Sequence, residues 1–445
     1  MATLHFGRDI PVRHQVDVFV AGGGPAGLAA ALAAARAGRS VYLAEGTGCF
    51  GGMGTSGLVP AFMQFGDGQR FVAGGIGREV YDRLWDAGGT GPRDDRKHPN
   101  HACAINAEVL KRVYDDMVLS EKNIRFTFFT QVLALQKDGS RPTHAVCHGK
   151  SGLFAVQSRM FVDGTGDGDL AVWAGAGFDK GDEHGAMMPG TLCSQFANID
   201  WPAVVASGVR PSEAIERALA DGVFTKPDRH VPGIWATGRD TGGGNIGHAF
   251  GVDGTDERSL TEAMLDGRRT LPEFLRFYRE YRPGFQQLAL TASGALLGIR
   301  ETRRIVGDYR MTVDDFQNRA SFEDEIGRYS YPVDIHPSRP GKETYQAFLH
   351  EFTTLRYQPG ETYGIPYRIL RPQGLSNLLV AGRCVSTDRA MQASIRVMPA
   401  CFLTGQAAGL AAAMACDHGE DTRSVPVADL QQQLKRLGAY LPNLP

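Results

Sequence analysis

The residues best suited to chemistry begin near the N-terminus, where Gly22, Gly24 and Gly27 follow the pattern Gly-x-Gly-x-x-Gly. In such a turn the first glycine permits a tight bend, the second lets a pyrophosphate approach the backbone, and the third lets a helix pack on a strand. Free amide groups at the helix N-terminus attract the phosphates. Glu45 ends the next apolar run, where its carboxylate can accept hydrogen bonds from ribose hydroxyls. The pattern predicts a dinucleotide site.

The kind of dinucleotide follows from Glu45 and from the segment after it. A carboxylate at that position would repel the 2′-phosphate of NADP. Residues 46–57 read GTGCFGGMGTSG, and their glycines allow a second close approach of backbone to ligand. A longer cofactor whose far half is also enclosed fits this pattern, so we expect FAD rather than NAD.

Asp334 and His336 form a candidate catalytic pair within residues 329–336, YSYPVDIH. If this segment is a strand, the two side chains share one face and can contact each other. The contact would hold the imidazole in one tautomer and favour its protonated form, which suits a group that takes a proton as hydride leaves. A buried histidine with a structural hydrogen bond explains the pattern equally well.

Two other segments supply further candidates for the substrate site. Arg300 lies in residues 298–304, GIRETRR, whose arginines could bind a substrate carboxylate or brace one domain on another, with bracing slightly favoured. His248 and Asn245 lie in residues 241–248, TGGGNIGH. Glycine-rich loops with polar residues often line binding sites, although a tight surface turn fits this sequence as well.

No metal site is predicted. His144 and His148 share a face if their segment is a strand, but they would lie about 13 Å apart, and Cys147 would point the other way. The seven cysteines are scattered and include no Cys-x-x-Cys pair, so neither zinc nor iron–sulfur spacing occurs.

The elements that must position these residues follow from hydrophobic patterning. Residues 16–21 read as a buried strand, the alanine-rich run to Gly38 as a helix, and residues 40–44 as a second strand, which together make a βαβ unit. We expect further strands at 124–129, 131–137, 143–149, 158–163 and 377–382, and helices at 106–120, 259–269 and 272–281.

The fold class expected is α/β, with a Rossmann-like FAD-binding domain interrupted by an inserted α+β substrate domain. From about residue 185 the sequence is richer in charged residues, aromatics and prolines, and near residue 377 an apolar strand pattern returns. We therefore predict a first part of the FAD-binding domain at 1–190, an insert at 191–370, and a C-terminal part of the FAD-binding domain at 371–445.

Composition excludes several classes of protein. The 445 residues include 42% hydrophobic and 22% charged residues, as in soluble globular proteins. A formal net charge of −2 removes the usual electrostatic basis for nucleic-acid binding. The N-terminus lacks the apolar segment of a secretion signal, and with the odd number of cysteines this favours a cytoplasmic protein. Residues 397–416 carry no charge but are rich in alanine, which predicts a tightly packed helix rather than a membrane span.

Several of these motifs together give a resemblance to a known family. The segments GGGPAGLAAA, EGTGCFGGMGT, FVDGTGDGDLAVWAGA, GIRETRRIVGDY, YPVDIH and NLLVAGRCVSTDRAMQASIRVMPACFLTGQAAGLAAA occur in order and span nearly the whole chain. This series resembles the FAD-dependent oxidoreductase family of the glutathione-reductase-like flavoproteins. The resemblance implies that the FAD is held by Gly22, Gly24, Pro25, Ala26, Glu45, Gly51, Gly52, Met53, Val132, Asp163, Gly164, Gly382 and Arg383.

The function expected from this resemblance is oxidation of a small polar organic molecule, with hydride transfer to flavin N5 and a proton passing to His336 or a neighbour. The electron acceptor could be oxygen, a quinone or a carrier, and the sequence does not choose among them. A flavin monooxygenase reduced by NAD(P)H is an alternative, although no second Gly-x-Gly-x-x-Gly is evident. A binding or escort protein with this fold and no catalysis is a second alternative.

Overall fold

The computed structural model describes residues 2–5 and 7–444. Its main sheet has the strand order β5-β2-β1-β8-β7-β6, and β17 pairs with β8 outside this path. Strands β5, β2, β1, β8 and β17 run parallel to one another, whereas β6 and β7 form an antiparallel hairpin, and β7 also pairs antiparallel with β8. The α/β fold with a Rossmann-like parallel sheet is therefore confirmed.

The main-sheet strands and the helices have the following bounds. The strands are β1 (Val12–Ala21), β2 (Val41–Ala44), β5 (Ile124–Thr127), β6 (Gln131–Asp138), β7 (Arg141–Gly149), β8 (Gly152–Asp163) and β17 (Leu378–Val380). The helices are α1 (Pro25–Arg36), α2 (Ile76–Asp86), α3 (Ala107–Leu119), α4 (Asp169–Trp173), α5 (Trp201–Ser207), α6 (Pro211–Ala220), α7 (Glu257–Tyr281), α8 (Val313–Gln317), α9 (Lys342–Thr354), α10 (Arg389–Ile395), α11 (Met398–Ala415) and α12 (Val427–Arg436).

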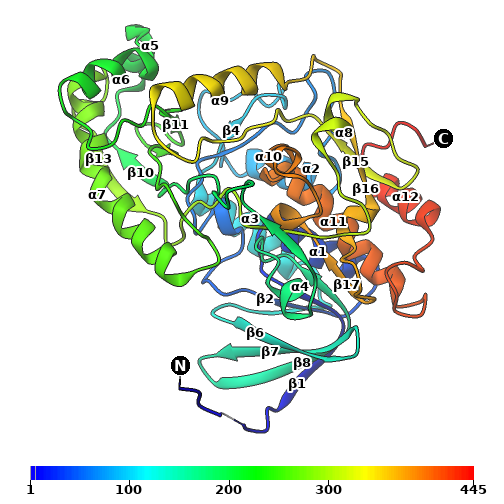
Figure 1. Ribbon diagram of the computed structural model, residues 1–445. Coiled ribbons are helices and arrows are strands. Elements are labelled where there is room, and N and C mark those ends of the chain that lie inside the picture. The colour runs from blue at the N-terminus through cyan, green and yellow to red at the C-terminus, as the bar shows by residue number, and fades with distance from the viewer. Residues whose placement is uncertain (1, 6, 445) are drawn as a thin grey trace.

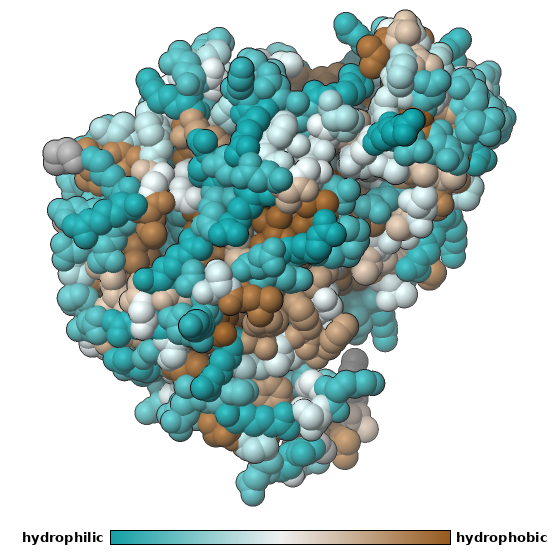
Figure 2. All heavy atoms as spheres, turned by 180° about the vertical axis from the view of Figure 1, so that it is seen from behind, coloured by the Kyte–Doolittle hydropathy of each residue, from teal (hydrophilic) through white to brown (hydrophobic). Residues whose placement is uncertain are grey.

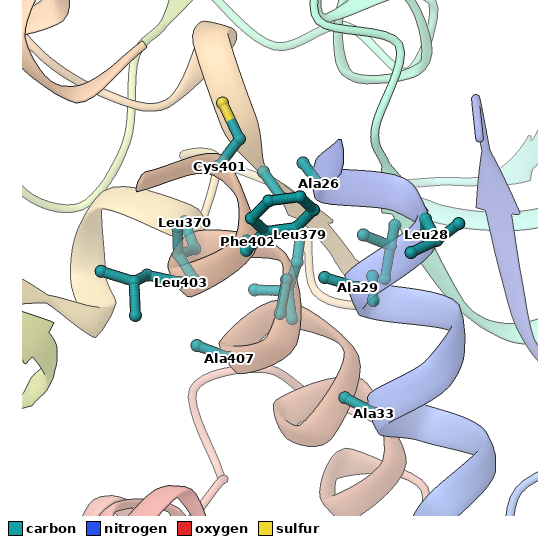
Figure 3. Packing of buried hydrophobic residues seen from close by; sticks show 14 of the residues in the cluster. Ala26, Leu28, Ala29, Ala33, Leu370, Leu379, Cys401, Phe402, Leu403 and Ala407 are labelled. Carbon is teal, nitrogen blue, oxygen red and sulfur yellow. The ribbon is translucent and has the colours of Figure 1, made fainter. Parts of the chain in front are cut away.

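Helices α1 and α11 pack side by side at unusually close range (Figure 3). A Cβ atom on Gly405 would lie 2.1 Å from the carbonyl oxygen of Ala26, and one on Gly409 would lie 2.0 Å from that of Ala30. Only glycine leaves room for the two backbones to approach this closely. Helix α11 is long and apolar enough to cross a membrane by length and composition, but 94% of it is buried inside the protein. It is a core helix of the kind that the small-residue sequence predicts.

A second, smaller sheet lies in the predicted insert and has the order β11-β12-β10-β13. Its strands are β10 (Ser194–Ala197), β11 (Ile234–Ala236), β12 (Gly242–Gly244) and β13 (Ala289–Ser293). With α5, α6 and α7 this sheet encloses a hydrophobic cluster of its own. In Figure 1 this green part lies well away from the β6–β7 hairpin and from α12. Side chains between Ile305 and Leu370, by contrast, belong to the main core.

Two local expectations are wrong. The segments 259–269 and 272–281 form the single helix α7, which continues through Pro272 because its apolar face is buried on both sides of that residue. The expected strand 329–336 is also absent: β15 ends at Tyr329, and 330–336 form no regular element. Pro332 explains this end, since proline cannot donate a hydrogen bond to a neighbouring strand.

The remaining strands are short and pair in twos. They are β3 (Ala61–Phe62) with β4 (Cys103–Ala104), β9 (Phe178–Lys180) with β14 (Arg303–Ile305), and β15 (Glu325–Tyr329) with β16 (Tyr363–Pro366). Three short 3₁₀ helices, η1 (Gly52–Gly54), η2 (Tyr367–Leu370) and η3 (Gly382–Cys384), complete the elements.

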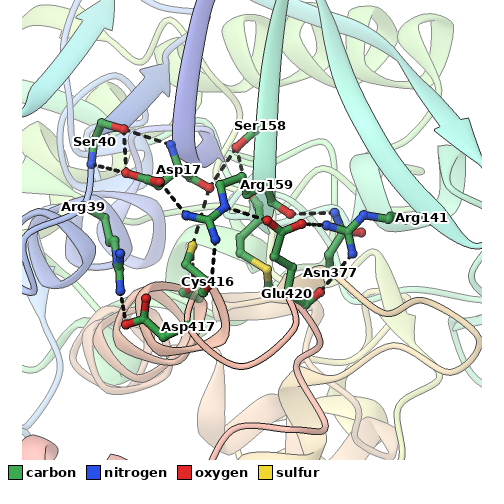
Figure 4. A network of polar contacts seen from close by, with 12 residues as sticks. Asp17, Arg39, Ser40, Arg141, Ser158, Arg159, Asn377, Cys416, Asp417 and Glu420 are labelled. Carbon is green, nitrogen blue, oxygen red and sulfur yellow. Dashed lines mark hydrogen bonds and ion pairs between the residues drawn. The ribbon is translucent and has the colours of Figure 1, made fainter.

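A polar network at the amino ends of the central strands ties the end of α11 to the sheet (Figure 4). Arg159 of β8 donates to Glu420 at 2.6 Å, to Asp17 of β1 at 3.1 Å and to the carbonyl oxygen of Cys416 at 2.5 Å.

The face of the molecule seen in Figure 2 is mainly hydrophilic, and its apolar residues are scattered in small patches. Such scattered apolar residues are ordinary for a protein surface.

Candidate functional site

A groove of about 480 Å³ opens at the carboxyl ends of the central parallel strands. In sheets of this kind ligands bind at that edge, in the crevice beyond the strand ends. The predicted FAD residues that line the groove are Gly22, Gly24, Pro25, Ala26, Glu45, Gly52, Met53, Val132, Gly164, Gly382 and Arg383. Segments from four distant parts of the sequence therefore meet here.

The glycine turn has the shape that a pyrophosphate requires. A Cβ atom on Gly27 would lie 1.8 Å from the carbonyl oxygen of Gly22, so a side chain there would push helix α1 away from the turn. A Cβ on Gly24, by contrast, would meet nothing within 4 Å, because this residue faces the open groove. The groove at the start of α1 thus admits a ligand against bare backbone, which fits FAD.

Glu45 follows β2 and is almost completely buried at the groove wall. Its Oε2 accepts the amide of Gly23 at 2.7 Å, and its Oε1 accepts the amide of Thr47 at 2.7 Å. These bonds fix the carboxylate beside the glycine turn while lone pairs remain free to accept from ribose hydroxyls.

Three predicted FAD residues lie behind the groove wall. Gly27 packs against Gly22, and Gly51 precedes the 3₁₀ turn η1 with its φ at 107°. Asp163 is fully buried and accepts hydrogen bonds from Thr165 and from the amide of Ala171. Burial raises the pKa of Asp163 to about 6. Its carboxylate shapes the loop after β8 and does not face the groove.

Sequence reasoning missed two groups in this groove. Asp167, in the loop after β8, pairs with Arg383 at 2.6 Å and accepts a hydrogen bond from Thr302 at 2.8 Å. Trp173, at the end of α4, lines the same groove. Both lie in the segment DGTGDGDLAVW, which the motif analysis had already singled out as a strand end.

A second cavity of about 130 Å³ adjoins the FAD groove. The two hollows share Met53, Ile299, Arg383, Arg396 and Met398 on their walls. The residues that line the cavity include three of the predicted catalytic residues, Arg300, Asp334 and His336. Its apolar residues include Val59, Ala61 and Val397. A small molecule in this cavity would lie next to the cofactor groove.

Arg300 is buried and has no carboxylate within ion-pair distance among residues 2–5 and 7–444. It donates to the carbonyl oxygen of Pro189 at 2.8 Å, to Thr191 at 2.9 Å and to Asn245 at 3.3 Å. Burial, with the charge of Arg396, lowers the pKa of Arg300 to about 10. The direct hydrogen-bond partners of the guanidinium are therefore neutral, although the charges of Asp334 and Asp228 act on it from a greater distance and favour its charged form.

The other two arginines of the same segment brace the structure, as expected. Arg303 pairs with Asp169 at 2.6 Å, and Arg304 pairs with Glu301 at 2.6 Å. Of the three arginines in residues 298–304, Arg303 and Arg304 therefore form ion pairs within the fold, and Arg300 lines the cavity.

His336 and Asp334 do contact each other, but from an irregular segment, with 3.4 Å between Nε2 and Oδ1. Asp334 also pairs with Arg396 at 3.3 Å and accepts from Tyr331 at 3.1 Å. The expectation that this pair favours protonated histidine is wrong. Burial, Arg300, His248 and Arg396 lower the pKa of His336 well below its ordinary value, so the imidazole is neutral at rest.

His248 lies behind His336 rather than in the cavity wall, with its Nε2 3.0 Å from Nδ1 of His336. A third ring, His230, stacks on His248 at 4.7 Å between centroids. One nitrogen from each of the three histidines lies within 4.8 Å of the others. His230 was missed because it lies in a loop, residues 227–233, whose sequence has no site-like pattern.

The chain matches the family described as FAD dependent oxidoreductase over residues 17–434. It belongs to that family, and its cofactor is FAD. The protein is therefore a flavin-dependent oxidoreductase, and the groove described above is formed by residues that the sequence predicts to hold its cofactor. Comparison with curated protein sequences gave no match.

Solved structures of similar fold share little sequence with the chain. The p-nitrophenol 4-monooxygenase PnpA of Pseudomonas putida DLL-E4 is 12% identical, with 95% of this chain and 81% of that one covered and a TM-score of 0.45. A geranylgeranyl bacteriochlorophyll reductase-like protein of Thermoplasma acidophilum is also 12% identical, with 95% and 83% covered and a TM-score of 0.45. Sdh1 of Mycobacterium smegmatis, in complex with UQ1, is 15% identical, with 96% and 72% covered and a TM-score of 0.40. Likeness at this level carries no information about substrate.

Proposed function

We propose that this flavoprotein oxidises a small polar organic acid, such as a hydroxy acid or an amino acid, in the cavity beside the FAD groove. The observation that carries the proposal is Arg300, a buried cation that lines a cavity which shares part of its wall with the cofactor groove. FAD, when bound, supplies the acceptor for hydride. The residues of this chain bind the substrate, exclude water and accept a proton.

Charge favours an anionic substrate. Arg396 is already balanced by Asp334, whereas Arg300 has only neutral partners among the described residues. A buried cation with no carboxylate in direct contact is unfavourable, and a carboxylate hydrogen-bonded to the guanidinium would relieve that cost. The small volume of the cavity, about 130 Å³, favours a compact molecule over a steroid or a lipid.

His336 supports the proton step. Its ring lies in the cavity wall, and its lowered pKa keeps it neutral and able to accept a proton. Removing hydride from an alcohol or amine carbon releases a proton from the attached oxygen or nitrogen, so a base at this place completes the oxidation.

The test is an anaerobic titration of the purified holoprotein with matched pairs of compounds, each pair containing a carboxylic acid and its uncharged amide. We expect one 2-hydroxy or 2-amino acid to bleach the flavin absorbance while its amide does not, with recovery in air or with a quinone. Bleaching by the amides alone would overturn the anionic substrate. Bleaching by NADPH alone would instead support the monooxygenase alternative.

A further inference from the structure

Four side chains form a continuous row that leads from the substrate cavity into the insert. Asp334 Oδ1 lies 3.4 Å from Nε2 of His336, and Nδ1 of His336 lies 3.0 Å from Nε2 of His248. Nδ1 of His248 lies 3.1 Å from Oδ2 of Asp228. The row is thus carboxylate, imidazole, imidazole, carboxylate, and the side chain of His248 is completely buried.

At the inner end of the row, Asp228 Oδ2 and His248 Nδ1 lie 3.1 Å apart, and both atoms are buried. Neither forms a well-aligned hydrogen bond with any group among residues 2–5 and 7–444. The other oxygen of Asp228 accepts the amide of His230 at 3.0 Å, which fixes the carboxylate. A buried carboxylate needs a donor, so the proton of neutral His248 belongs on Nδ1.

The position of the proton on His248 determines which ring nitrogen of His336 carries a proton. With its proton on Nδ1, His248 has a bare Nε2 that must accept from its neighbour. His336 therefore carries its own proton on Nδ1, and its Nε2 is left without one. Of the two imidazoles, only His336 lines the cavity, and its Nε2 lies 3.4 Å from Oδ1 of Asp334, which lines the cavity too.

The charged groups around the row keep both rings neutral. Arg300 and Arg396 face His336, and burial with the charge of Arg300 also opposes protonation of His248. Asp228 and Asp334 act in the opposite direction on His248. Tyr331 and Tyr345 are the neighbouring phenols, next to Asp334 and His230 respectively, and burial raises the pKa of each.

A metal ion explains the histidines less well. The rings of His230 and His248 stack nearly parallel, at 10°, so their in-plane lone pairs point side by side instead of converging on one point. The positive charge of the buried Arg300 also acts on all three rings. Both features oppose a divalent cation at this place.

We propose that Asp228 and His248 are positioning residues that hold His336 in the tautomer with a bare Nε2, ready to take the proton released by the substrate. This inference rests on the proposed function. As the C–H bond breaks, its electron pair leaves with hydride to FAD, and the O–H or N–H proton moves to Nε2 of His336. After this transfer the row contains three protons, one in each of the contacts Asp334–His336, His336–His248 and His248–Asp228.

Asp228→Asn tests the row without removing atoms. The amide of the asparagine can donate to Nδ1 of His248, so His248 would carry its own proton on Nε2. His248 would then donate to Nδ1 of His336, and the proton of His336 would move to Nε2 of that ring. The base would then be blocked, as in a catalytic triad whose aspartate is replaced by asparagine. Asp82→Asn is the control, because Asp82 lies on α2 and pairs with Arg78 and Arg96 rather than with any member of the row.

The first readout needs no substrate. Nitrogen-15 NMR of histidine-labelled holoprotein reports which ring nitrogen carries the proton, with the two signals assigned by their loss in His248→Asn and His336→Asn. We expect both rings to be protonated on Nδ1 in the unchanged protein and on Nε2 in Asp228→Asn, with no change in Asp82→Asn. Protonation on Nε2 in the unchanged protein, or no shift in Asp228→Asn, would overturn the assignment.

The second readout uses the substrate found by the anaerobic titration. Asp228→Asn should slow flavin reduction at least about 100-fold, the usual contribution of a general base. Substrate binding and FAD content should stay unchanged, and the rate should now rise with pH into the alkaline range. An equal rate in Asp228→Asn would overturn the role of the row.

Two further results distinguish a failure of the proposed function from a failure of the proposed proton row. If NMR shows the expected tautomers but no acid reduces the flavin, the proposed function fails while the tautomer assignment stands. One tightly bound metal ion per chain, lost in His230→Ala, would overturn the proton row.

Discussion

Arg383 Nη2 lies 2.6 Å from Asp167 Oδ1, and this ion pair joins the ends of β17 and β8 where the FAD groove meets the substrate cavity. Arg383 lines both hollows, whereas Asp167 lines only the groove. Burial opposes the charge of the guanidinium, but Asp167 holds the pKa of Arg383 above its ordinary value. A neutralised cation is therefore placed at the boundary between the two hollows.

Asp167→Asn is expected to raise the reduction potential of the bound flavin. The change leaves the positive charge of Arg383 uncompensated, and a cation near the flavin stabilises its reduced, anionic form. Arg383→Gln should lower the potential. Both potentials are measured by anaerobic titration against redox dyes. Equal potentials in the two variants would show that the pair lies outside the electrostatic reach of the flavin.

The glycine turn allows a matched comparison of cofactor binding and folding. Gly24→Asp places a negative charge in open space facing the groove, so the apoprotein should fold normally and lose affinity for FAD. Gly27→Ala places a methyl group 1.8 Å from a carbonyl oxygen, so it should destabilise the apoprotein by about 1–3 kcal/mol or more. FAD titration and thermal unfolding of the apoproteins distinguish the two effects. Normal FAD affinity in Gly24→Asp would contradict the predicted pyrophosphate position.

Arg300→Gln should weaken the binding of small carboxylates by about 10- to 100-fold, because a hydrogen bond to a charged group contributes about 1.5–3 kcal/mol. Titration of the oxidised holoprotein with carboxylate ligands, followed by the change in flavin absorbance, measures the affinity. Arg276→Gln is the control, since Arg276 is exposed on α7 and pairs with Glu280. Equal loss in both variants would mean that Arg300 does not bind the anion.

The raised pKa of the buried Asp163 leads us to expect that the free energy of unfolding depends on pH. Its pKa is raised by burial to about 6, above the value near 3.8 expected in the unfolded chain. Between these two values the folded state binds more protons, so this group makes the free energy of unfolding fall as pH rises from about 4 to 6. A difference of about two units corresponds to about 3 kcal/mol at most.

The measurement is chemical denaturation of the apoprotein and of Asp163→Asn at several pH values. The stability of the unchanged protein relative to the variant should be greater at pH 4 than at pH 7. A constant difference across this range would show that Asp163 is not protonated in the folded state near pH 5.

Much of the cofactor site could be predicted from sequence because its residues act through local backbone geometry. Gly22, Gly24 and Gly27 define one turn, and Glu45 follows one strand later, so short-range patterns suffice. Asp163 shows the limit of this reasoning. Its place in the chain is beside the groove, but its hydrogen bonds to Thr165 and Ala171 turn the carboxylate inward.

The substrate site was harder to predict because it depends on contacts between distant segments. Asp334 and His336 meet as expected, although Pro332 prevents the strand that was thought to align them. The direction of the pKa shift of His336 could not be predicted from the sequence, because the residues that bury its ring, and the charges of Arg300 and His248, belong to other parts of the chain.

The sequence by itself determined the βαβ unit, the buried alanine-rich helix and the family, because glycine spacing and apolar periodicity are local properties. Only the tertiary structure decided which arginine of residues 298–304 reaches the cavity and which ones brace the fold. It also placed Asp228, His230 and His248 behind His336, although as many as 108 positions separate them in sequence. Charges separated this far act on one another only after folding buries them together, where the low dielectric strengthens their interaction.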